Sequence, residues 1–174
     1  IKVGMVNDLA PMEFLNKDGV FEGVNRDVLD LISSRSDLKF EYVGFDSWHL
    51  LYQAMQDEKI DMLGSITPTE KRKRQILFSE SYWQMPWVII HSQHLGKQTK
   101  LTEFQGKHVA IVKGTYLIEE LIEQHPLVRF TLVDNRQQAL LALQQERVDG
   151  FITTMASATE VLKQDHIITM MISV

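Results

Sequence analysis

The chain has 174 residues, a formal net charge of −5 and no cysteine, and 44% of its residues are hydrophobic. This composition predicts a globular protein with its own core, built as one domain or as two small ones. The acidic balance disfavours nucleic acid as a partner, and the absence of cysteine excludes disulfides, thiolate metal sites and a cysteine nucleophile.

Apolar runs alternate with amphipathic helical patterns from the first residue onward. In the first half, the pattern predicts strands at 1–6, 39–45 and 60–66 and helices at 25–36 and 47–59. Asn25 is a plausible cap for the first of these helices, and Leu31 and Ile32 are expected among its core-facing side chains.

The second half repeats this alternation. Strands are predicted at 107–112, 129–134 and 148–153, and helices at 116–125 and 136–147. Strands that alternate with helices in this way are typical of a mostly parallel sheet with helical crossovers. The predicted fold class is therefore α/β.

Two segments of the chain also resemble each other. QDEKIDMLGS at 56–65 aligns with QQERVDGFIT at 144–153, and each lies at a helix-to-strand junction. The match is that of a generic α/β junction, or it indicates two lobes of similar build, divided at 1–87 and 88–174. In the second case a ligand cleft is expected between the lobes, beyond the carboxyl ends of the strands.

A basic run lies directly after the predicted strand at 60–66. Thr67 is a good helix N-cap, Pro68 suits the first helical position, and Glu70 completes a capping box. Arg72 then lies one turn inside the helix, where its guanidinium could hold a carboxylate in the cleft by two parallel bonds. Arg74 projects from another side of the helix. The remaining basic residues are expected on the surface.

Lobe two offers a similar strand-to-helix turn, with Gly114 for the tight bend and the hydroxyl of Thr115 beside it. Trp48 opens the helix at 47–59 and either lines the cleft or packs on the core. No catalytic or cofactor motif is present, and no metal-binding histidine spacing; His91 and His94 alone would give two ligands on a connector. No cofactor and no metal are therefore expected.

Three stretches together carry a resemblance to a known family. GVFEGVNRDVLDLI, IDMLGSITPTEKRKRQILFSESY and LTEFQGKHVAIVKGTY occur in the order typical of the type 2 periplasmic solute-binding proteins, family 3. The resemblance covers the whole chain and implies a Venus flytrap, in which two hinged α/β lobes close on a ligand. The chain is shorter than the family implies, so lobe two is expected to be incomplete at its C-terminus.

The resemblance assigns site residues by position. Arg72 matches the arginine that holds the ligand carboxylate, and Thr67 and Ser65 match hydroxyl and backbone contacts to the same group. Further matches are an aromatic cleft position and a lobe-two turn that closes over the carboxylate, at Trp48, Thr115 and Tyr116.

Two positions depart from the family pattern. Thr154 stands where amino-acid binders commonly carry an acid that pairs with the ligand ammonium, and Leu9 replaces an aromatic residue. These departures disfavour an α-amino acid and leave a simple carboxylate or an amino-acid-like solute open.

FSESYWQMPWVII and the turn without an acidic partner resemble the periplasmic sensor modules of BvgS-type hybrid histidine kinases. The resemblance implies a non-catalytic periplasmic sensor domain of a membrane-tethered parent protein, with dimerisation through the kinase left open. The alternatives are a free amino-acid-binding subunit of an ABC transporter and an enzyme on the same scaffold, which would need an acid or base in the cleft.

Overall fold

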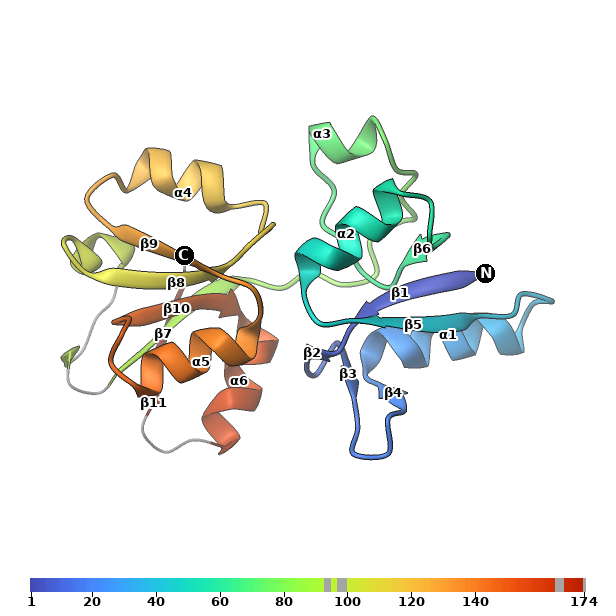
Figure 1. Ribbon diagram of the computed structural model, residues 1–174, viewed down its shortest axis with the longest axis horizontal. Helices are drawn as coiled ribbons and strands as arrows, with labels where there is room; N and C mark the ends of the chain where they lie inside the picture. The colour runs from blue at the N-terminus through green and yellow to red at the C-terminus, as the bar shows by residue number, and fades with distance from the viewer. Residues whose placement is uncertain (93–94, 97–99, 165–167, 174) are drawn as a thin grey trace.

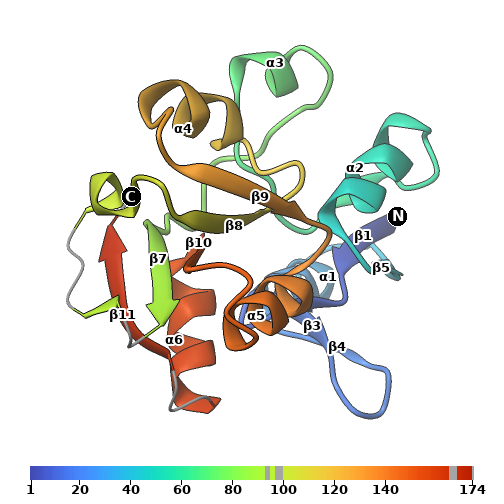
Figure 2. The same ribbon diagram turned by 60° about the vertical axis from the view of Figure 1, so that its left-hand side comes forward.

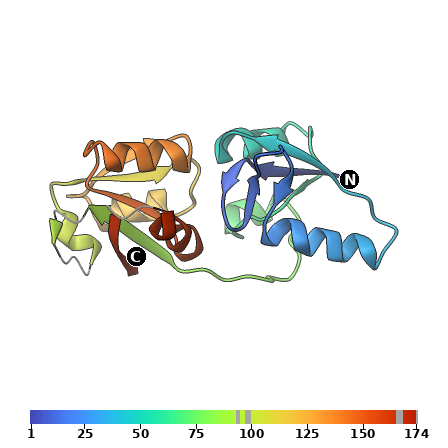
Figure 3. The same ribbon diagram turned by 90° about the horizontal axis from the view of Figure 1, so that it is seen from below.

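The computed structural model of the chain describes residues 1–92, 95–96, 100–164 and 168–173. Two α/β units lie side by side, and the segment 74–86, which contains no helix or strand, runs between them (Figures 1 and 3). We call the part of the chain from β1 to α3 lobe one and the part from β7 to β11 lobe two. None of the described helices is long and apolar enough to cross a membrane.

Lobe one is built on a three-stranded parallel sheet in the order β5-β1-β6. Its strands are β1 (Lys2–Val6), β5 (Glu41–Phe45) and β6 (Met62–Leu63). The helices α1 (Val24–Ser34) and α2 (Trp48–Gln56) cover opposite faces of this sheet (Figure 1). The alternation of β1 explains this arrangement, because Val3 and Met5 pack toward α1 whereas Val6 packs toward α2.

A second, antiparallel sheet of lobe one has no counterpart in the predicted elements. It consists of β2 (Asp8–Leu9), β3 (Glu13–Leu15) and β4 (Phe21–Glu22). These strands have two or three residues each, which is too short to produce a readable alternation.

Lobe two contains a five-stranded sheet in the order β11-β7-β10-β8-β9. Its strands are β7 (Trp87–Ser92), β8 (His108–Val112), β9 (Arg129–Val133), β10 (Gly150–Thr154) and β11 (Ile168–Ser173). β8 pairs in parallel with β9 and β10, whereas β7 is antiparallel to both β10 and β11. Because β7 begins at Trp87 and pairs with strands of lobe two, we propose that the lobe boundary lies just before Trp87, one residue ahead of the expected division at 87/88.

Helices cover both faces of this sheet (Figure 2). On one face lie the 3-10 helix η2 (Leu101–Phe104) and α4 (Ile118–Gln124), and on the other α5 (Arg136–Gln144) and α6 (Met155–Gln164). Neighbouring residues of one strand point to opposite faces: Phe151 packs toward α5 and α6, and Ile152 toward α4. Lobe two therefore has a core on each side of a central sheet.

The two similar segments at 56–65 and 144–153 have the same local structure. Asp61 accepts the N–H of Lys2 and Asp149 accepts the N–H of His108, each at 2.7 Å, so each carboxylate holds the first residues of a neighbouring strand. The residue three positions earlier adopts a left-handed backbone in both copies, at Glu58 and Glu146. This correspondence supports the interpretation of two lobes of similar build.

Several expectations about individual residues are wrong. Asn25 does not cap α1, which begins at Val24; it lies inside the helix with its side chain fully buried. Leu31 and Ile32 are 50% and 39% exposed, because α1 packs mainly through Leu29. His91 is not on an exposed connector but is buried in β7, and His94 lies outside the described residues.

Candidate functional site

Arg72 is the buried member of the basic run. Its residue is 9% exposed, whereas the other three basic residues of the run are exposed: Lys71, Lys73 and Arg74. It belongs to α3 (Glu70–Lys73), which is a single turn. The cap of α3 is Thr69, whose hydroxyl accepts the Arg72 backbone N–H at 3.2 Å, so the expected cap at Thr67 is wrong. Since one turn has a small dipole, attraction of an anion here would depend on the Arg72 side chain.

The guanidinium of Arg72 reaches across to lobe two. Its Nη1 donates to the carbonyl oxygen of Thr67 at 3.0 Å, and its Nη2 donates to that of Gly114 at 3.2 Å. The rings of Trp48 and Tyr52 lie 5.5 and 5.4 Å from its central carbon. Burial lowers the pKa of Arg72 from its usual value, and the nearby Tyr52 opposes this shift. The group stays a cation at physiological pH.

Gly114 is the point where lobe two meets this group. Its carbonyl oxygen also accepts the Nε1–H of Trp48, at 3.0 Å, so two donors of lobe one converge on one acceptor. The φ of Gly114 is +81°, and a Cβ at this position would lie 3.0 Å from Cδ1 of Trp48. The contact between the lobes therefore requires glycine, both for its backbone conformation and for its lack of a side chain.

The structure places the other predicted site residues in varied settings. The hydroxyl of Ser65 lies 3.0 Å from Nδ2 of Asn25, and the hydroxyl of Thr115 donates to the Val112 carbonyl at 2.7 Å. Both are thus engaged within their own lobes. Thr67 contributes its backbone oxygen to Arg72.

The two remaining predicted residues belong to lobe two. Tyr116 is 37% exposed and packs edge-on against Trp87, with 6.0 Å between the ring centroids. Thr154 ends β10, and its hydroxyl accepts the backbone N–H of Ser157 at 3.4 Å. Among the described residues, neither Tyr116 nor Thr154 forms a hydrogen bond with Arg72.

A second set of contacts between the lobes was not predicted. Arg136, the first residue of α5, forms an ion pair with Asp8 of lobe one at 2.7 Å. The hydroxyl of Ser157 donates to the carbonyl oxygen of Ala10 at 3.0 Å, beside the same ion pair. These partners are more than a hundred residues apart in the chain, so no local pattern could have indicated them.

A comparison with protein families identifies the chain. The family model for bacterial extracellular solute-binding proteins, family 3, matches residues 1–102. The chain belongs to this family.

Relatives of this solute-binding protein include both sensors and transport receptors. It is 27% identical over 91% of its length to the virulence sensor protein BvgS of Bordetella pertussis, of which it spans 13%. It is 26% identical over 89% of its length to the putative ABC transporter arginine-binding protein 2 of Escherichia coli, of which it spans 63%.

A solved structure supports the fold assignment of the solute-binding protein. The periplasmic VFT2 domain of Bordetella pertussis BvgS matches with a TM-score of 0.82 and 26% identity, over 95% of this chain and 71% of that one. The fold is therefore a two-lobed Venus flytrap of the type 2 periplasmic binding proteins, and the chain covers only part of the solved domain.

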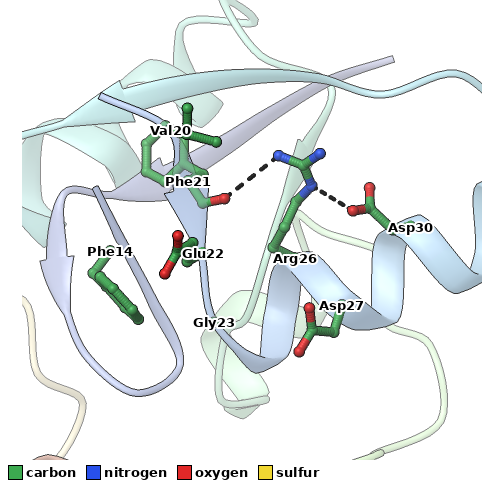
Figure 4. A pocket seen from close by; sticks show the side chains of 8 residues that line it. All are labelled: Phe14, Val20, Phe21, Glu22, Gly23, Arg26, Asp27 and Asp30. Atoms are coloured by element: carbon green, nitrogen blue, oxygen red, sulfur yellow. Dashed lines mark hydrogen bonds and ion pairs between the residues drawn. The ribbon is translucent and has the colours of Figure 1, made fainter. Parts of the chain in front are cut away.

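Lobe one also has a pocket of about 400 Å³ that is separate from the predicted site (Figure 4). It lies in lobe one at the start of α1, with apolar walls from Phe14 and Phe21 and acidic groups at its edge. Its arginine, Arg26, is already paired with Asp30 at 2.8 Å. None of the predicted site residues lines this pocket. It therefore gives no support to the predicted cleft, which depends on the contacts around Arg72.

Proposed function

We propose that this chain is the ligand-sensing Venus-flytrap domain of a membrane sensor histidine kinase, and that it binds a small carboxylate or an amino-acid-like solute between its lobes. The observation that carries the proposal is the buried guanidinium of Arg72, which lies where lobe one meets Gly114 of lobe two. The similarity to BvgS over 91% of the chain supports the sensor assignment.

In this proposal the carboxylate replaces the Gly114 carbonyl oxygen as the acceptor of Arg72 Nη2. A carboxylate is the stronger acceptor, because it carries charge and can bind the guanidinium fork through both oxygens. Trp48 would provide an apolar wall beside it, and Thr67, Ser65, Thr115 and Tyr116 would surround the ligand as predicted. Because Thr154 supplies no negative charge, recognition of an ammonium group would need another partner.

Several companion assignments follow from the same proposal. The domain would lie in the periplasm, on a parent protein tethered to the membrane, and would bind without catalysing a reaction and without a cofactor. Nucleic acid is not proposed as a partner, because the chain has a net charge of −5 and Arg72 points into the lobe junction rather than outward.

The second candidate function is a free amino-acid-binding subunit of an ABC transporter. The similarity to the arginine-binding protein 2 of Escherichia coli, over 89% of this chain, favours it. The two candidates share the ligand site and differ in their tether. Sequencing the full gene product distinguishes them, since a membrane helix and a kinase domain after this region support the sensor and their absence supports the receptor.

Replacing Arg72 with alanine is expected to weaken carboxylate binding strongly. Loss of hydrogen bonds to a charged group costs about 1.5–3 kcal/mol, which corresponds to an affinity roughly 10- to 150-fold weaker. Isothermal titration calorimetry with a panel of small carboxylates, arginine and glutamine measures this change.

Arg74→Ala is the matched control. It also removes one arginine charge, but the side chain of Arg74 is exposed and lies two positions after Arg72. It is expected to leave the affinity within about twofold of the unmodified protein. Equal affinities in the Arg72→Ala and unmodified proteins would show that the guanidinium does not hold the ligand.

A further inference from the structure

A chain of polar groups runs from the core of lobe one, at Glu13, to Tyr82, which is 46% exposed. Glu13 is 1% exposed and Asn25 is fully buried. Glu13 Oε1 accepts the backbone N–H of Val6 at 2.7 Å, and its Oε2 lies 2.6 Å from the side-chain amide of Asn25. The second polar atom of the Asn25 amide lies 3.0 Å from the hydroxyl of Tyr82. The same hydroxyl lies 2.7 Å from the carbonyl oxygen of Gly64.

Tyr82 connects this hydrogen-bond chain to the segment between the lobes. It lies in the segment 74–86 that runs between the lobes, whereas the groups it contacts belong to the body of lobe one. Its hydroxyl therefore anchors this segment, which we call the crossover, to the core of lobe one. A change in the hydrogen bonds of the chain would act directly on this anchor.

Counting hydrogens shows that an ionised Glu13 leaves the chain incomplete. A carboxylate can only accept, so the Asn25 amide must turn its NH₂ toward Glu13 and its oxygen toward Tyr82. Tyr82 then faces two acceptors, the Asn25 oxygen and the Gly64 carbonyl, with one hydrogen to share between them. One buried acceptor is left without a full hydrogen bond, which is unfavourable.

A single added proton removes this conflict. If Glu13 carries a hydrogen on Oε2, that hydrogen is donated to the Asn25 oxygen after a half-turn of the amide. The amide NH₂ then donates to the Tyr82 oxygen, and Tyr82 donates its hydrogen to Gly64. The hydroxyl of Ser65, 3.0 Å from the same amide atom, accepts from the NH₂ before the turn and can donate to the Asn25 oxygen after it. The contact of 2.6 Å between Glu13 and Asn25 is in the short range typical of O–H···O bonds.

We propose that Glu13 is a neutral carboxylic acid in the folded protein, that its proton completes the hydrogen-bond chain Glu13–Asn25–Tyr82–Gly64, and that loss of this proton loosens the anchor of the crossover between the lobes. The chain would act as a proton-sensitive control of lobe movement. It does not depend on which ligand the protein binds.

The electrostatic surroundings agree with the geometry. Burial raises the pKa of Glu13 to about 7, against the opposing effect of its bonds to Val6 and Asn25. Of the described groups that contact Glu13 or its partners, Tyr82 is titratable; burial and the nearby Glu13 raise its pKa, so it stays neutral. Because folding raises the Glu13 pKa, the stabilisation by its proton is present in acid and is lost as the pH rises through about 7.

The proton itself can be observed directly. Carbon-13 NMR of the Glu13 side-chain carboxyl, assigned through its bonded neighbours, should give the shift of a neutral acid at about pH 5.5 and that of a carboxylate at about pH 8.5. A carboxyl that is already ionised at the lower pH would overturn the proposal. No variant is needed for this measurement.

The effect on the crossover is tested by hydrogen exchange of the backbone amides in 79–86, corrected for intrinsic rates. Exchange should become faster in the unmodified protein between about pH 5.5 and 8.5. Glu13→Gln, which is permanently neutral and can donate to Asn25, should keep slow exchange at both pH values. Tyr82→Phe should exchange fast at both. Glu41→Gln, which changes an exposed carboxyl of β5, should behave as the unmodified protein.

The outcomes separate the two parts of the proposal. If Glu13 titrates as expected but exchange in 79–86 is insensitive to pH, the coupling to the crossover is wrong. If Glu13→Gln responds to pH as strongly as the unmodified protein, another group is the sensor. Neither result bears on ligand binding by Arg72, which is measured by calorimetry.

Discussion

Replacing Gly114 with alanine is expected to separate the two lobes where they meet at Arg72. The φ of +81° is unfavourable for a residue with a side chain, at a cost of about 1–2 kcal/mol. The added Cβ would also lie 3.0 Å from the Trp48 ring. Relief of this crowding moves the turn away and weakens both hydrogen bonds to the Gly114 carbonyl.

Gly106→Ala is the matched control for this prediction. Gly106 also has a positive φ, of +76°, but a Cβ there would meet no atom within 4 Å. Both variants should lose similar stability through backbone strain, whereas only Gly114→Ala should increase the distance between the lobes. Spin labels on one introduced cysteine in each lobe measure that distance, since the chain has no cysteine of its own. An unchanged distance in Gly114→Ala would contradict the role of this contact.

Shortening Phe151 to alanine is expected to have the largest effect on stability. Phe151 lies on β10, is 1% exposed and packs between the sheet and the helices α5 and α6. Removal of a buried phenylalanine ring costs about 3–5 kcal/mol, because the transfer energy is lost and a cavity remains.

Urea unfolding followed by circular dichroism measures this loss. Leu132→Ala is the control: Leu132 lies on β9 of the same sheet and is 48% exposed, so its truncation should cost no more than about 0.5 kcal/mol. A Phe151→Ala protein as stable as Leu132→Ala would mean that the two-sided core of lobe two is misplaced.

Most regular elements could be predicted from sequence, because their signals are local. In lobe two, β8, α4, β9 and α5 carry apolar residues with the period of their own structure and lie within the expected ranges, and β10 extends one residue beyond its range, to Thr154. Helix geometry allows only one of Arg72 and Arg74 to face the cleft, and the resemblance to the family selects Arg72; the burial of Arg72 agrees with that choice. Its role toward a ligand stays a proposal.

The start of α3 shows the limit of such signals. Thr67 and Thr69 are both good caps, and the sequence TPTE contains a capping box that favours the first. The structure uses Thr69, because its hydroxyl reaches the Arg72 N–H. The helix therefore begins two residues later than predicted and has a single turn.

The contacts that define the lobe junction could not be predicted. The ion pair of Asp8 with Arg136 and the hydrogen bond of Arg72 to Gly114 join residues far apart in the chain. Asn25 shows the same difficulty within one lobe: it looks like a cap by residue type, and only its neighbour Glu13 explains why it is buried. Such pairs depend on how the elements assemble, and the sequence of one segment contains no information about that assembly.

The bond from Trp48 to the Gly114 carbonyl gives the protein an optical reporter of its own movement. The indole is sensitive to solvent, and separation of the lobes would exchange its protein partner for water and shift its emission to longer wavelengths. The other tryptophans, Trp83 and Trp87, lie in the crossover and at the start of β7, and phenylalanine at both positions would leave a single emitter. Opening and closing could then be followed in real time by fluorescence, without any attached dye.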